Sequence, residues 1–95
     1  MTEPLVLREP GGTITVASEV VRAIVRQAAE AVDGVEVRKK RLRVKDGRVE
    51  VGLAVRYGAV LPEVGEDVQG RIAEGLRTMC GLDPAAEDVS IEALT

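Results

Sequence analysis

Two adjoining segments carry the clearest patterns of the chain. Val49-Glu-Val-Gly-Leu-Ala-Val-Arg-Tyr-Gly58 has a strand pattern, and the run from Leu61-Pro-Glu-Val64 to Cys80-Gly-Leu82 has a helix pattern. The first part alternates apolar and other residues with the period of two that is typical of a β-strand. Pro62 is favoured in the first turn of a helix, where its missing N–H is not needed. Gly81 is favoured just past the end of a helix. These residues therefore predict a strand that leads through a tight break into a helix.

Before this stretch, the pair Asp46-Gly47 lies between two strand-like runs. Asp-Gly is a strong signal for a two-residue hairpin turn. With this pair at the turn, the sequence predicts that the following residues face each other: Lys45 and Arg48, Val44 and Val49, Arg43 and Glu50, and Leu42 and Val51.

The apolar positions of the first hairpin strand do not keep one parity. Val35 and Val37 are odd-numbered, whereas Leu42 and Val44 are even-numbered. Because side chains alternate between the two faces of a strand, we expect a bulge or break near residues 39–41. The same alternation along the second strand predicts that Tyr57 points inward.

Two amphipathic helices are expected. Ser18 is predicted to cap the first helix, which runs to about Val32 and ends at Asp33-Gly34. Its polar side is predicted to carry Arg22 and Glu30, among others. The buried stripe of the second helix is predicted to contain Val64, Val68, Ile72, Leu76 and Met79. Within that helix, Gly65 and Gly75 lie in the apolar arc and suggest close backbone approach, whereas Gly70 points away.

The element order predicts an α+β fold. A short strand at Thr13–Val16 precedes the first helix, and Val89–Ala93 alternates as a last strand. The order β-α-β-β-α-β indicates a two-layer sandwich of the split βαβ type, with two helices on one face of a mostly antiparallel sheet of three to four strands. In that arrangement the first and third strands are central and parallel, and the last strand is an edge. Residues 1–12 are predicted to be a flexible tail, and residues 13–95 a single domain.

The composition argues against catalysis. The chain has no histidine and one cysteine, Cys80, which excludes an internal disulfide and a cysteine-based zinc cage. Cys80 is expected at a helix C-terminus, whose partial negative charge opposes thiolate formation, so a packing role is favoured. The acidic groups at residues 63–67 and 87–88 lack the spacing of a calcium loop. We expect a protein that is not an enzyme and has no catalytic residues, cofactor or metal.

The charge distribution is strongly uneven. Residues 38–48, the basic hairpin, carry seven basic residues and one acid, whereas the rest of the chain carries six basic and fifteen acidic residues. One interpretation is a solvated edge strand that its cations guard against edge-to-edge association. The other is a surface that binds an acidic partner or the anionic leaflet of a membrane. The candidate residues are Arg38, Lys39, Lys40, Arg41, Arg43 and Lys45.

The same hairpin permits two further interpretations. It could dock on an acidic helix face of another copy, in a head-to-tail contact that builds rings or filaments. The acids of that face are Glu63, Glu66, Asp67 and Glu74. Alternatively the hairpin binds nucleic acid, for which seven cations favour phosphate contacts. Against nucleic acid, the chain has no aromatic residue other than Tyr57 to stack on bases and no Gly-x-x-Gly clamp. A ligand-sensing regulatory domain is a weaker option that rests on fold analogy.

The order and spacing of these elements resemble the bacterial alkaline-shock-protein family over about residues 12–94. The resemblance is carried by Gly12-Thr-Ile-Thr-Val16, Ser18-Glu-Val-Val21, Val32-Asp-Gly-Val35, the densest part from Val49 to Leu82, and Val89-Ser-Ile91. It implies a non-enzymatic scaffold protein of the cell-envelope stress response that self-associates. It also implies recruitment to the inner face of the membrane by a small membrane-anchoring protein. The chain has no signal-peptide pattern and no apolar run long enough to cross a bilayer, so we expect it in the cytoplasm.

Overall fold

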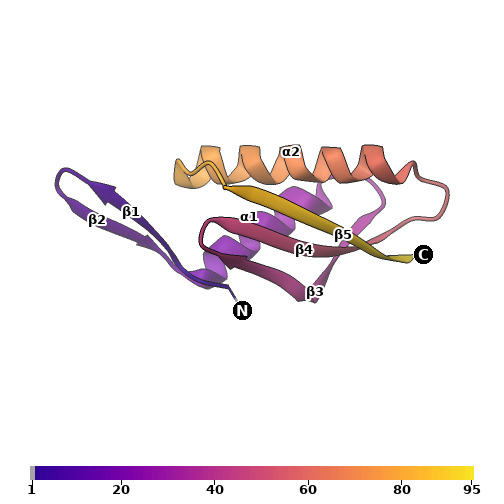
Figure 1. Cartoon of the computed structure of the whole chain (residues 1–95), viewed down its shortest axis with the longest axis horizontal. Coiled ribbons are helices and arrows are strands. Elements are labelled where there is room, and N and C mark those ends of the chain that lie inside the picture. Colours follow the sequence, from indigo (N-terminus) through magenta and orange to yellow (C-terminus); the bar gives the residue numbers. More distant parts are fainter. Residues whose placement is uncertain (1) are drawn as a thin grey trace.

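The computed structural model describes residues 2–95 and contains two helices and five strands (Figure 1). Their bounds are β1 (Leu5–Glu9), β2 (Gly12–Val16), α1 (Ser18–Glu30), β3 (Val35–Lys45), β4 (Arg48–Val55), α2 (Leu61–Cys80) and β5 (Ala86–Leu94).

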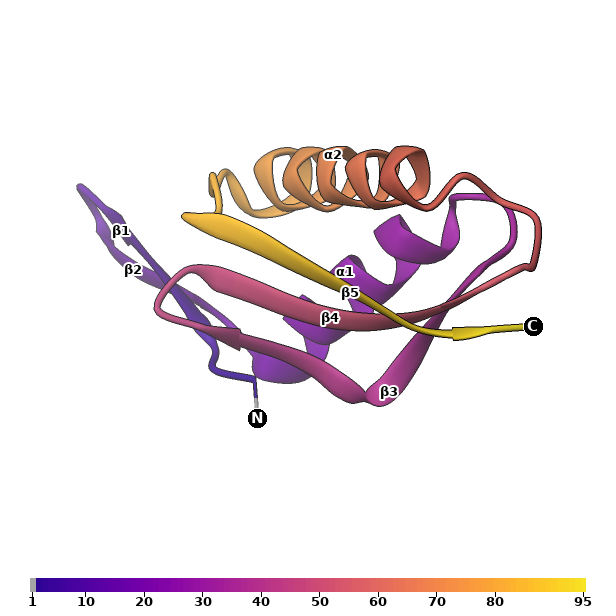
Figure 2. The ribbon, with the colours of Figure 1, turned by 45° about the vertical axis from the view of Figure 1, so that its right-hand side comes forward.

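The fold is an α+β two-layer sandwich, as the sequence predicts. Three strands form the main sheet in the order β3-β4-β5, and the two helices lie side by side on it, α1 against β3 and α2 against β5 (Figures 1 and 2). Strands β3 and β4 are antiparallel, and β4 and β5 are parallel. The parallel pair requires a crossover, which α2 supplies. No helix within residues 2–95 combines the length and apolar character that a membrane crossing needs.

The strand connectivity differs from the predicted split βαβ arrangement. The expected first strand is β2, and it pairs with β1 in a separate two-stranded sheet instead of lying centrally beside β4. Strand β4 is central, and β5 is an edge strand as predicted. The reason is local: residues 10–11 form a two-residue turn, so β2 meets β1 at almost no cost in loop closure.

The expected flexible tail, residues 1–12, therefore contains a strand. Its first described residues also contact the body of the protein. The Glu3 N–H donates to the Val44 carbonyl at 2.9 Å, and the Glu3 carboxylate accepts from the Asp46 N–H at 3.2 Å. Thr2 is buried. The segment from Thr2 to Glu9 is thus bound along the edge of β3 and then paired with β2.

The predicted β3–β4 register is confirmed at all four positions, from Lys45 opposite Arg48 to Leu42 opposite Val51. The register shifts between Val37 and Leu42, as the change of parity predicts. On both sides of this bulge the apolar side chains of β3 face the helices. The core between sheet and helices is almost entirely aliphatic: Val35, Val37, Leu42, Val44, Val49, Val51, Leu53, Val55, Val21, Val25, Ala29, Val68, Ile72, Leu76 and Cys80.

Several local predictions about the helices need correction. Ser18 is the first residue of α1 rather than its cap, because Ala17 occupies the cap position and no side chain bonds there. Helix α1 also ends at Glu30, before Val32, although Gly34 does adopt the left-handed conformation (φ 78°). Helix α2 ends at Gly81 with φ 66°, as predicted.

The buried stripe of α2 has a spacing of four residues. Val68, Ile72, Leu76 and Cys80 are buried, whereas Met79 is 69% exposed and was wrongly placed in the core. Neither of the two glycines expected to permit close approach is required for it. A Cβ atom at Gly75 would make ordinary contacts, at 3.5 Å, with Ala28 and Ile24 of α1, and one at Gly65 would meet nothing within 4 Å.

Gly70 provides a test of the helix assignment. It lies in the interior of α2, and a Cβ atom there would meet nothing within 4 Å. Because glycine costs about 1 kcal/mol relative to alanine inside a helix, Gly70→Ala should raise the free energy of unfolding by up to ~1 kcal/mol. Urea denaturation followed by circular dichroism measures this. The matched variant Gly81→Ala should lower stability, since residue 81 has a positive φ. A loss of stability in Gly70→Ala would contradict the open helix surface described here.

Candidate binding surface

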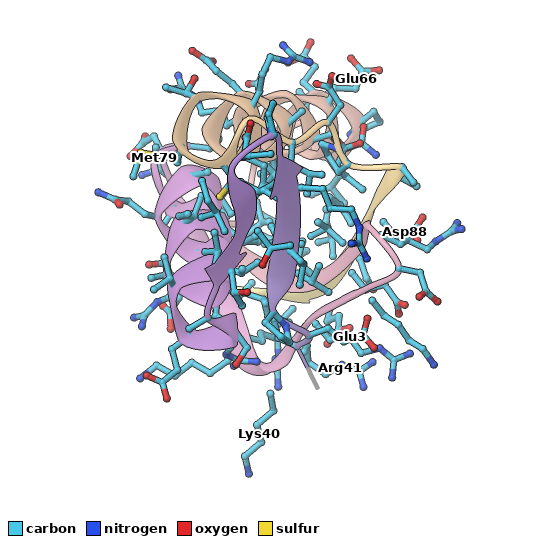
Figure 3. All side chains as sticks on the ribbon, turned by 90° about the vertical axis from the view of Figure 1, so that its left-hand side faces the viewer. Glu3, Lys40, Arg41, Glu66, Met79 and Asp88 are labelled. Atoms are coloured by element: carbon cyan, nitrogen blue, oxygen red, sulfur yellow. The ribbon has the colours of Figure 1, made fainter. Side chains whose placement is uncertain are left out.

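Four consecutive basic residues are turned outward by the bulge in β3. In a regular strand every second side chain would face the helices. Here Arg38, Lys39, Lys40 and Arg41 are all exposed, between buried Val37 and buried Leu42. We call these four residues the basic apex. Lys40 extends away from the body of the molecule (Figure 3).

Side chains of α1 hold the bulge in place. The Arg22 guanidinium donates to the carbonyls of Lys39 at 2.9 Å and Leu42 at 3.0 Å, and to the Thr2 hydroxyl at 3.2 Å. On the other side of the bulge, the Glu30 carboxylate accepts from the Val37 N–H at 3.0 Å. A bulge interrupts the ladder and leaves backbone groups unpaired. Arg22 and Glu30 supply partners for these groups.

Sequence reasoning placed Arg22 and Glu30 on the polar side of α1 but did not give them this role. A signal for this role was present in the sequence. Arg22 and Glu30 are two charged residues eight positions apart on the predicted helix, and the strand that follows shows a change of parity. The missing information was that α1 packs against β3 rather than against another strand.

The arginines of the hairpin are paired with acids on the open face of the sheet. Arg41 Nε lies 3.0 Å from the Glu92 carboxylate, and Arg38 Nε lies 3.8 Å from the same group. Nearer the turn the ion pairs are Arg43 with Glu50 at 3.3 Å and Arg48 with Asp88 at 2.7 Å. These pairs are solvent-exposed, so each contributes little to stability. Their main effect is to reduce the positive potential of the arginines.

The lysines differ from the arginines. Within residues 2–95, Lys39, Lys40 and Lys45 form no ion pair, and all three are exposed. At the basic apex, Glu92 is the single acid that forms an ion pair among the described residues. The apex therefore keeps an excess of positive charge, whereas the arginines nearer the turn each have their own carboxylate.

Gly52 forms the floor of the open face. A Cβ atom at this position would lie 2.7 Å from Arg41 Cβ and 2.8 Å from Glu92 Cδ. The absence of a side chain thus allows the Arg41–Glu92 pair to lie across the middle strand. The surrounding open hollow of about 590 Å³ is lined mainly by charged and polar side chains of β3, β4 and β5.

The predicted acidic face lies on the outer side of α2. Glu63, Glu66, Asp67 and Glu74 are all exposed. Figure 3 places Glu66 and Lys40 on opposite sides of the molecule, Glu66 on the helix side and Lys40 on the sheet side. The acidic face and the basic apex of one chain therefore do not contact each other, and the structure keeps the two charges apart.

Tyr57 and Cys80 are the one aromatic residue and the one cysteine of the chain. Tyr57 is 78% exposed, so its predicted inward orientation is wrong: β4 ends at Val55, and strand alternation no longer applies. Cys80 is buried, and this burial raises the pKa of its thiol, which favours the protonated form. A group of three or more potential metal ligands is not found within residues 2–95.

A second, more apolar hollow of about 330 Å³ lies between the helices. Ile24, Ala28 and Ala31 of α1 line one side, and Gly75 and Met79 of α2 line the other. The exposed side chain of Met79 contributes to this hollow. Gly75 faces Ala28 and Ile24 of α1 across this hollow.

Comparisons with protein-family models, with curated proteins and with solved structures found no match. The resemblance to the alkaline-shock-protein family therefore stays a prediction from sequence order and spacing. Function must be argued from the surface itself.

Arg22 gives a test of how the apex is held. Arg22→Met keeps the apolar stem and removes the donors, which leaves the Lys39 and Leu42 carbonyls without these bonds. We expect the free energy of unfolding to fall by about 1–3 kcal/mol, with faster amide hydrogen exchange at residues 38–42. Arg26→Met is the control, since Arg26 makes one exposed pair with Glu30 and should change stability by less than ~0.5 kcal/mol. Equal effects of the two variants would contradict this role.

Gly52 gives a second test. Gly52→Ala places a methyl group against Arg41 Cβ, an atom fixed to the backbone, so the strands must shift. We expect a loss of about 1–3 kcal/mol in the free energy of unfolding, as for other overpacked sites. Thermal and urea denaturation measure this loss. Gly70→Ala is the control, because a methyl group added there meets nothing within 4 Å. An unchanged or higher stability for Gly52→Ala would mean that residue 41 is not packed over residue 52.

Proposed function

We propose that this protein is a non-enzymatic interaction and scaffold protein of the cell-envelope stress response. In this proposal a membrane-anchored partner recruits it from the cytoplasm to the inner face of the membrane. The link to the envelope comes from the sequence resemblance to the alkaline-shock-protein family. The recruitment step is argued from the surface, and it uses the basic apex together with Lys45.

The single observation that supports recruitment is the outward orientation of four consecutive cations at the bulge. Two of them, Lys39 and Lys40, have no ion pair within residues 2–95. A cluster of exposed like charges creates a local potential that attracts an oppositely charged partner and accelerates encounter. The partner that fits is an acidic segment of the membrane-anchored protein. Its binding should weaken as salt increases, because exposed charges are screened.

The rigid support of the apex is consistent with recognition. Arg22 and Glu30 hold the backbone on either side of the four cations, so the backbone of the apex does not need to be ordered on binding. Ordering of a flexible segment costs conformational entropy at the moment of binding. Long lysine side chains on a fixed backbone leave only rotamer freedom to be lost.

A nucleic-acid-binding module that uses residues 38–48 is the second candidate. The exposure of Tyr57 favours it more than the sequence did, since an exposed aromatic ring can stack on a base. Against it, Arg43 and Arg48 already have carboxylate partners on the sheet face where phosphates would lie. These carboxylates would repel a phosphate backbone.

Self-association remains part of the proposal. The basic apex and the acidic face of α2 point in different directions, so one copy can present its apex to the acids of the next. A contact between two different surfaces is heterologous and builds rings or open chains rather than a closed pair. The acids available for it are Glu63, Glu66, Asp67 and Glu74.

The experiment is a pull-down from detergent-solubilised native membranes with Lys39→Ser/Lys40→Ser/Lys45→Ser. The control Arg26→Ser/Arg56→Ser/Arg71→Ser changes the net charge equally but lies outside the basic hairpin. We expect the lysine variant to capture about tenfold less of a membrane protein than the wild type does. The control should capture as much as the wild type, and this capture should weaken as salt increases.

Other outcomes overturn the proposal in defined ways. Loss of RNA or DNA instead of a membrane protein would establish the second candidate. Binding of wild type to protein-free vesicles with anionic lipids would assign the apex to the leaflet itself. Equal losses in both variants would mean that net charge, and not the apex, controls capture.

A further inference from the structure

The hairpin formed by β1 and β2 projects from the body of the protein (Figures 1 and 2). Beyond its base, where Leu5 joins the core, the two strands pair with each other and not with the main sheet. The molecule is consequently long and narrow, with extents of 50 × 21 × 18 Å. An isolated two-stranded hairpin is marginally stable in water. This projecting arm therefore needs further pairing or packing to be well ordered.

Both faces of the arm expose apolar side chains. Val6 pairs with Thr15 on one face, and Leu7 pairs with Ile14 on the other. Val6 is 53% exposed and Ile14 is 52% exposed. Neither face is covered by the chain itself, although the base of the arm is anchored.

The outer edge of β3, by contrast, is blocked. The Arg22 guanidinium donates to carbonyls of this edge, and the Glu30 carboxylate accepts from the Val37 N–H. The Glu3 N–H donates to the Val44 carbonyl. A strand of another molecule would have to displace these partners. Covering an edge in this way is one means by which proteins prevent unwanted strand pairing.

The outer edge of β5 is also protected. Its sequence carries Glu87, Asp88 and Glu92, and the Gln69 side chain donates to the Glu87 carbonyl at 3.0 Å. A register shift after Leu53 bends the ladder between β4 and β5. Charges, a capped carbonyl and an irregular ladder all oppose pairing of this edge with a second copy of itself.

The edge of β2 lacks all of these devices. The strand reads Gly12-Thr-Ile-Thr-Val16, with no charge, no proline and four successive β-branched residues. Within residues 2–95 its backbone hydrogen bonds to no strand other than β1. The other strand of the arm, β1, carries Arg8 and Glu9. An uncharged edge of high β-propensity is the kind that pairs with a further strand.

We propose that β2 pairs antiparallel with β2 of a second copy across a two-fold axis, and that the two arms form a four-stranded ribbon in the order β1-β2-β2-β1. This proposal does not rest on the function proposed above, because it uses neither the basic apex nor the acidic face of α2. Its contact is isologous and closes at two copies.

A second copy fits this edge for two reasons. An uncharged strand meets itself without like-charge repulsion, whereas two β5 strands would bring acids together. In addition, the arm projects at one end of the molecule, so antiparallel pairing leaves the two bodies on opposite ends of the ribbon (Figure 1). The ribbon also places the β-branched residues of β2, Ile14 among them, beside β2 of the second copy, where cross-strand pairs of β-branched residues are favourable.

The test compares Thr13→Glu/Thr15→Glu with the wild type by sedimentation equilibrium in high salt. Within one chain Thr13 faces Arg8, so the first substitution is compatible with the hairpin. Across the two-fold axis the same substitutions bring carboxylates of both copies together. We expect the wild type to have about twice the 10.1 kDa chain mass. The dimer dissociation constant of the variant should be larger by about tenfold or more. The control Thr78→Glu/Thr95→Glu has the same charge change at exposed positions outside the arm and should remain dimeric.

Variants that carry one cysteine in addition to buried Cys80 provide a second measurement that does not depend on the stability of the Glu variant. Thr13→Cys, Ile14→Cys and Thr15→Cys should form covalent dimers under mild oxidation, with the highest yield at the residue nearest the axis. Tyr57→Cys, equally accessible, should not. A wild type that stays monomeric at high concentration, or a Thr13→Glu/Thr15→Glu variant that stays dimeric, overturns the proposal.

High salt separates this contact from the head-to-tail contact of the proposed function. Strand pairing between uncharged edges should persist in molar salt, whereas a contact between the basic apex and acidic residues should dissociate. A dimer that appears only in low salt and is lost in Lys39→Ser/Lys40→Ser/Lys45→Ser would overturn the strand-pairing proposal and support the electrostatic contact.

Discussion

The side chains of Val37 and Leu42 both face the helices, although five positions separate them in one strand. Strand side chains alternate strictly, so two positions an odd number apart point to opposite faces unless the ladder is interrupted. The bulge between them resolves this conflict in favour of the core, because slipping the register would expose every apolar side chain on one side of it. The exposure of the basic apex follows directly from that requirement.

The bulge also explains why Lys39 and Lys40 differ from the arginines of the hairpin in their partners. Arg43 and Arg48 lie in the regular part of the hairpin, and each has a carboxylate within reach. Arg41, next to the regular part, reaches Glu92. Arginine suits such positions because its planar group donates several hydrogen bonds to a carboxylate. Lys39 and Lys40 lie within the interruption and extend beyond the sheet. Of the cations of the basic hairpin, the unpaired lysines fit the proposed recognition role better than the ion-paired arginines do.

The sequence predicted those features that depend on neighbouring residues. The Asp46-Gly47 turn fixed the register, parity required the bulge, and Gly81 marked the end of α2. The errors concern choices between distant partners. Thr13–Val16 looked like a strand of the main sheet, but the nearby β1 competes successfully for it. Met79 fitted the helical arc, but the buried residues of α2 are spaced by four, so Cys80 is buried instead. Periodicity identifies an apolar arc without specifying where along it the neighbouring layer lies.

The candidate surface was predicted in composition but not in shape. A run of cations is visible in any sequence, whereas its supports, Arg22 and Glu30, depend on which strand α1 covers. The two proposed contacts also depend on different physics and lie on different parts of the chain. The charges of the apex attract a partner over a distance and are screened by salt, whereas the β2 edge pairs through hydrogen bonds that form only on contact. A dimer joined through its arms would present two apices, so that binding of one apex to the partner proposed above raises the effective concentration of the other. Weak single contacts of exposed lysines could then give firm attachment, without any change in the apex itself.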